Sequence, residues 1–70
     1  MSRAESEYRA RELWREAYSH APHEALRAAE SVLAPHGLIC DGTFVYASIP
    51  MKLLMDLRVA LMVVVLETRG

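Results

Sequence analysis

Three histidines and one cysteine are the residues of this 70-residue chain that could offer nitrogen and sulfur ligands to a zinc ion: His20, His23, His36 and Cys40. Zinc takes imidazole and thiolate ligands in tetrahedral geometry. The spacing of these four residues matches no established zinc pattern, and histidines in turn-rich segments more often cap helices or face solvent. We therefore expect no metal ion and no cofactor.

His36 and Cys40 also have the residue types of a catalytic base and its nucleophile. A catalytic cysteine needs a group that orients the imidazole and donors that stabilise an oxyanion. The sequence marks neither, and a lone cysteine in a short strand is typically a small buried hydrophobic residue. Six glutamates are expected on solvated helix faces, where nothing favours acid–base work. The sequence therefore predicts no enzyme and no catalytic residue.

The first element that would position these residues is a helix over about residues 2–18. Ser2 and Glu5 have the spacing of a capping box, in which the serine hydroxyl accepts from the backbone amide of the glutamate. The apolar face of this helix is expected to hold Ala10, Leu13, Trp14, Ala17 and Tyr18.

A second helix is predicted over about residues 22–33, with Pro22 in its first turn, where a missing amide hydrogen costs nothing. Gly37 can adopt the left-handed conformation that ends such a helix. Because the loop between the two helices is short, they are expected to form an antiparallel helical hairpin.

A short β-hairpin is expected over about residues 38–48. Asp41 and Gly42 lie between two apolar stretches, and a type I′ turn favours this dipeptide because both central residues need positive φ. The fold class is therefore mainly α, or a small α+β fold.

A third helix, over about residues 50–67, is apolar around most of its circumference, with a narrow polar stripe of Lys52, Asp56 and Glu67. The competing interpretation is a buried strand at 59–66, since successive valines favour extended backbone. A small domain can cover one side of such a helix, so a homodimer is expected to cover the other side. The predicted dimer interface is Leu54, Leu57, Arg58, Leu61 and Val65.

Arg58 is a charged residue on the apolar side of this predicted helix, where a charge is rarely buried without a partner. It either extends past the edge of the dimer or pairs with a glutamate of the first helix. Alternatively, it sets the register between subunits or contacts an acidic group on a target.

One edge of the first helix carries residue types that are enriched at binding hot spots. A partner-binding patch is therefore predicted at Tyr8, Arg11, Arg15 and Tyr18. The alternative is that Trp14 and Tyr18 belong to the core and the remaining residues are a solvated helix edge.

Length and charge limit the remaining function classes. Seventy residues suit a single domain over 1–70, and a net charge of −1 favours neither nucleic acid nor an anionic membrane as a partner. The longest uncharged run near the carboxyl end has eight residues, against about 20 for a membrane span. A charged amino terminus and a single cysteine predict a cytoplasmic protein.

These features together predict a small non-enzymatic protein-binding modulator of bacterial or phage origin, a homodimer that inhibits or redirects a partner protein. One alternative is a DNA-binding regulator similar to winged-helix proteins, with the 22–33 helix as recognition helix and the 38–48 hairpin as wing. A second alternative is a small subunit of a larger assembly.

Overall fold

The computed structural model describes residues 2–37 and 49–69, which are helical over most of their length. The elements are α1 (Arg3–His20), α2 (Pro22–Leu33), the 3-10 turn η1 (Ala34–His36) and α3 (Met51–Arg69). This part of the chain holds no strand, and the prediction of a mainly helical protein is confirmed. The β-hairpin predicted over 38–48 lies outside the described residues.

The helix ends follow local signals in the sequence. The Ser2 hydroxyl accepts a hydrogen bond from the Glu5 backbone amide at 3.2 Å, as the capping-box spacing predicts. Pro22 occupies the first turn of α2, and Gly37 ends η1 with a φ of 74°. The 59–66 segment lies inside α3, so its alternative assignment to a strand is wrong.

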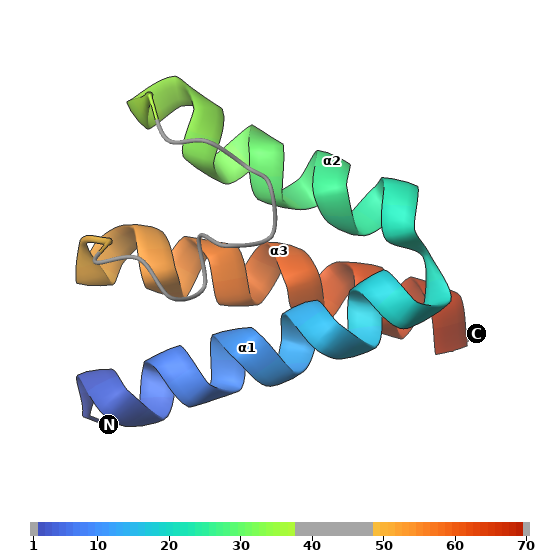
Figure 1. Ribbon diagram of the computed structural model, residues 1–70, viewed down its shortest axis with the longest axis horizontal. Coiled ribbons are helices and arrows are strands. Elements are labelled where there is room, and N and C mark those ends of the chain that lie inside the picture. Colours follow the sequence, from blue (N-terminus) through green and yellow to red (C-terminus); the bar gives the residue numbers. More distant parts are fainter. Residues whose placement is uncertain (1, 38–48, 70) are drawn as a thin grey trace.

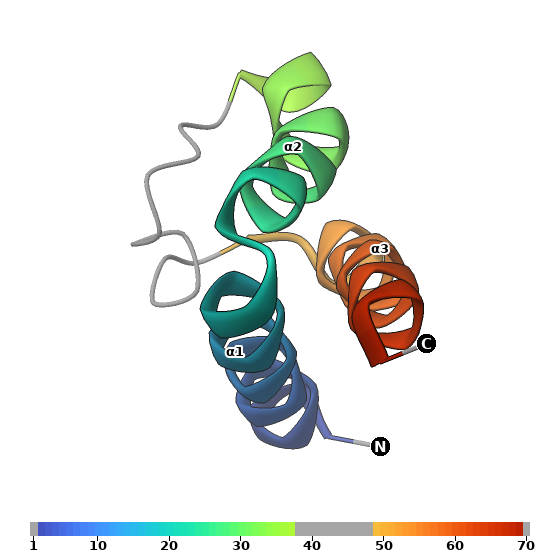
Figure 2. The ribbon, with the colours of Figure 1, turned by 90° about the vertical axis from the view of Figure 1, so that its right-hand side faces the viewer.

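The three helices form two layers. Figure 1 shows that α1 and α2 meet at one corner and diverge from it, and that α3 runs in the same direction as α1. Figure 2, turned by 90°, shows that α1 and α2 form one layer and that α3 crosses a single face of it. One side of α3 therefore faces the α1–α2 layer, and the other side faces away from it.

The core lies between α3 and the α1–α2 layer. The layer contributes mainly small side chains, and Ala17, Ala25 and Ala29 are each 0% exposed. Their small size lets α3 approach closely, and α3 fills the space with larger apolar side chains. These are Leu54, Leu57, Leu61, Val64 and Val65.

Four of the residues assigned to a dimer interface lie in this core. Leu54, Leu57, Leu61 and Val65 are at most 3% exposed in the single chain, because the α1–α2 layer covers them. An interface between copies therefore has to use other side chains of α3, and the expected interface residues are corrected accordingly. The dimer itself stays a prediction.

Candidate protein-binding surface

An apolar stripe runs along the outer side of α3. Its six side chains lie within about 120° of one another around the helix axis, so they share one face of the helix, and each is between 38% and 64% exposed. We call this surface the α3 stripe; it consists of Met51, Met55, Val59, Met62, Val63 and Leu66. A contiguous apolar surface on a small protein marks an interaction site more often than isolated exposed apolar residues do.

The α3 stripe continues into an open groove between α1 and α3. This groove has a volume of about 240 Å³, and we call it the α1–α3 groove. Leu13 of α1 forms one wall, and side chains of α3 form the other: Met55, Arg58, Val59, Met62 and Val63. The surface available to a partner is therefore concave and apolar, with a single charged side chain in its lining.

Charged residues of α1 flank this groove. An adjoining hollow of about 360 Å³ shares Leu13, Arg58 and Met62 with the groove. Its remaining lining comes from Arg9, Glu12 and Glu16. An apolar centre with a charged edge is the usual anatomy of a protein–protein interface.

Arg58 connects α3 to α1 within one chain. Its Nη1 atom donates to the Ser6 hydroxyl at 3.4 Å and lies 3.5 Å from the Met55 sulfur. Ser6 is a fully buried polar residue of α1, which the sequence analysis did not single out. The sequence does carry a signal for the burial of Ser6: it precedes Ala10 by four residues and therefore shares the buried face of α1 with Ala10.

Two further contacts hold α3 beside α1 near the two ends of the helices. At the carboxyl end, Arg69 Nη2 and Glu16 Oε1 form an ion pair at 2.6 Å. At the amino end, the Arg3 guanidinium donates to the Ile49 carbonyl. The exposed Arg69–Glu16 ion pair contributes about 1 kcal/mol or less, so packing supplies most of the stability between α1 and α3.

Comparison with known proteins gives no relative whose surface could be set beside this one. No protein-family model, no curated protein and no solved structure matches this chain. The proposal of a function therefore depends on the chemistry and placement of the described side chains.

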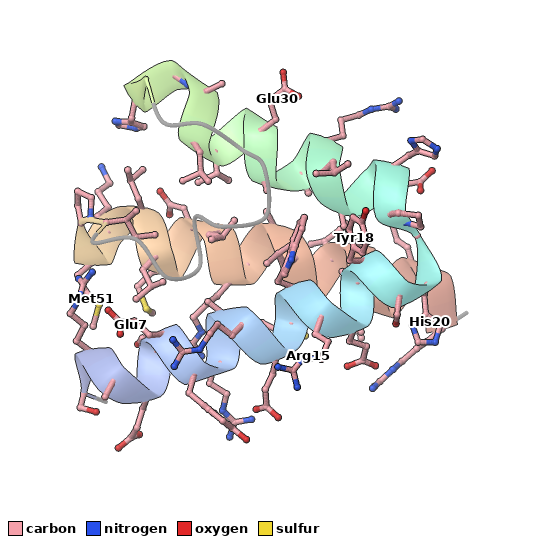
Figure 3. All side chains as sticks on the ribbon, viewed as in Figure 1. Glu7, Arg15, Tyr18, His20, Glu30 and Met51 are labelled. Carbon is pink, nitrogen blue, oxygen red and sulfur yellow. The ribbon has the colours of Figure 1, made fainter. Side chains whose placement is uncertain are left out.

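The predicted partner-binding residues of α1 are only partly brought together. Tyr8 is 57% exposed and Tyr18 46%. Arg15 is exposed and Arg11 is half-buried. In Figure 3 Arg15 projects from the outer side of α1, whereas Tyr18 lies on the side facing α2. We call these four residues the α1 edge.

The aromatic pair at the end of the α1 edge belongs partly to the core. The rings of Trp14 and Tyr18 have centroids 5.2 Å apart with a tilt of 37°, a geometry that aromatic pairs favour. Trp14 packs against the core cluster, while nearly half of the Tyr18 surface faces solvent. Tyr18 is therefore the more accessible residue of this pair.

The histidines lie at helix ends and on the surface. His20 Nδ1 is 2.9 Å from the Glu16 carbonyl oxygen at the end of α1, and His23 and His36 are exposed. Within residues 2–37 and 49–69, no three side chains of ligating type are grouped to hold a metal ion; Cys40 is outside these ranges. In the same residues, no helix has the length and hydrophobicity that crossing a membrane requires.

Proposed function

We propose that this protein is a small non-enzymatic protein-binding modulator, a homodimer that inhibits or redirects a partner protein. The observation that carries the proposal is the α3 stripe, which stays exposed after α3 has packed its other side against the α1–α2 layer. Soluble monomers rarely leave such a surface in contact with water. A covering chain would remove it from water.

Assembly and partner binding use different sides of α1 in this proposal. Leu13, which lines the α1–α3 groove, is five positions from both Tyr8 and Tyr18, or about 140° around the helix axis. The α1 edge therefore stays accessible when the groove is covered. A dimer would present two copies of the edge to a partner protein.

The alternative of a DNA-binding regulator has less support from the surface of α2. The exposed residues of α2 include His23, Glu24, Arg27 and Glu30, so two carboxylates accompany one arginine. Helices that read nucleic acid normally present a basic face to the phosphates. The alternative of a subunit in a larger assembly would use the same α3 stripe with a different chain covering it.

We expect sedimentation equilibrium at micromolar concentration to give twice the chain mass of 7.9 kDa. Val59→Glu should give a folded species at the monomer mass, because a desolvated charge opposes association while Val59 lies outside the core. Glu30→Gln, on the exposed surface of α2, is the control and should remain dimeric. A folded wild-type chain at the monomer mass would contradict the proposed assembly.

We expect Tyr8→Ala and Arg15→Ala to weaken capture of the partner from a lysate of the native host by tenfold or more. Truncating an interface anchor typically costs about 2 kcal/mol or more of binding free energy. The melting temperature should change little, because both side chains are exposed. His23→Ala, on α2, is the control.

Two outcomes would contradict partner binding by the α1 edge. One is normal capture by both variants. The other is a wild-type protein that captures no protein but shifts a DNA fragment with a steep salt dependence, which would favour the DNA-binding alternative.

A further inference from the structure

We infer that the chain covering the α3 stripe is a second copy whose α3 runs antiparallel to the first, with Val59 of both copies beside the two-fold axis. Each Lys52 then lies opposite Glu67 of the partner subunit. This inference rests on the proposed assembly and specifies its geometry. The charge, shape and extent of the stripe support it.

The charges that flank the stripe are self-complementary. Lys52 and Glu67 are exposed near opposite ends of α3, and their fifteen-residue separation turns them only about 60° apart around the helix. The midpoint between them falls at 59–60, which is close to the centre of the stripe. A two-fold axis perpendicular to α3 at that point brings the lysine of each copy to the glutamate of the other.

A parallel pair lacks this match. It places the two Lys52 residues at one level and the two Glu67 residues at another, and it aligns the dipoles of the two α3 helices. In the antiparallel pair the helix dipoles oppose each other. The two Asp56 residues would lie about 10 Å apart along the axis, a separation at which salt screens much of their repulsion.

Reversal of the stripe also pairs long side chains with branched ones at two of its levels. Met51 and Met55 occupy its amino-terminal half, and Met62, Val63 and Leu66 occupy the other half. Reversal places Met55 against Val63 and Met51 against Leu66. Val59, at 64% the most exposed residue of the stripe, meets its own copy.

The extent of the surface fits a standard dimer. From Met51 to Leu66 the stripe runs for about 22 Å, along a molecule whose longest extent is 30 Å. A standard interface buries about 800 Å² on each partner, or about one sixth of the 4584 Å² surface of this chain. The stripe supplies the apolar centre of such an interface, and the adjoining α1–α3 groove adds Leu13 and the charged Arg58 beside it.

Disulfide trapping tests the direction of the pair, with Cys40→Ser as background. Val59→Cys should form a covalent dimer under mild oxidation, because a disulfide needs Cα atoms about 4.4–6.8 Å apart. Met51→Cys alone should not, since the two copies of residue 51 would lie about 25 Å apart. Leu66→Cys alone should not either, but a mixture of the Met51→Cys and Leu66→Cys proteins should form a covalent heterodimer.

Charge reversal tests the register. Lys52→Glu should raise the dimer dissociation constant about fivefold or more. The substitution replaces the two attractive pairs of Lys52 with Glu67 of the partner subunit, at the edge of the interface, by two repulsive pairs. Adding Glu67→Lys to the same chain should restore the wild-type value. Arg27→Glu, a charge change of the same size on α2, is the control and should leave the dissociation constant unchanged.

The outcomes separate this inference from the proposed assembly. Self-trapping by all three cysteine variants would establish a parallel pair and overturn the antiparallel arrangement. A dimer in sedimentation with no trapping at these positions, or with no response to Lys52→Glu, would also overturn it while leaving the assembly intact. A folded wild-type monomer would contradict both.

Discussion

Leu57→Asp is expected to leave the chain unfolded at 25 °C. Leu57 is 0% exposed in the core between α3 and the α1–α2 layer, so the carboxylate would be buried without a designed partner. Truncation of such a leucine to alanine already costs about 2–5 kcal/mol. A domain of this length has a free energy of unfolding of about 3–10 kcal/mol. Burying the aspartate charge costs more than the truncation to alanine, and this cost is expected to exceed the free energy of unfolding.

Circular dichroism would measure this loss of helix. Val59→Asp is the matched control, because it introduces the same group two residues away on the outer side of α3; it should keep the helical spectrum and lose only the dimer. A folded Leu57→Asp protein would mean that α3 does not pack on α1 and α2 through this face.

Oxidation of methionine is expected to separate the dimer into folded monomers, raising its dissociation constant by tenfold or more. Three of the four methionines in the chain lie on the α3 stripe: Met51, Met55 and Met62. Oxidation converts a flexible apolar side chain into a polar sulfoxide and disrupts methionine-rich interfaces. Because none of the three belongs to the core cluster, the helical spectrum should persist.

Sedimentation before and after mild peroxide treatment would measure the change, with mass spectrometry reporting the sulfoxides. A chain with Met51→Leu, Met55→Leu and Met62→Leu is the control and should stay dimeric after treatment. Full oxidation of the three wild-type methionines with an unchanged dissociation constant would show that the stripe is not the interface.

Helix positions could be predicted from the sequence because their signals are local. The expected ranges 2–18, 22–33 and 50–67 agree with α1, α2 and α3 to within two residues at each end. The Ser2 hydroxyl, the ring of Pro22 and the left-handed Gly37 each act on backbone groups within a few residues. The positions of these helix ends therefore do not depend on tertiary contacts.

The covered side of α3 could not be predicted in the same way. A helix that is apolar on two sides has no periodicity that selects one of them, so Leu57 and Val59 look equivalent in the sequence. Packing of α3 against the α1–α2 layer buries Leu57 and leaves Val59 exposed. The contact of Arg58 with Ser6 depends on the same packing, because 52 residues separate the two side chains.

The alanine-rich α1–α2 layer has a consequence for how the chain becomes ordered during synthesis. Most of the buried side chains that α1 and α2 contribute are alanines, while α3 supplies most of the large apolar ones. Two helices of this kind gain little by packing on each other alone, and isolated helices of this length are marginal in water. We therefore expect α1 and α2 to remain without a stable core until α3 has emerged from the ribosome and can pack against them.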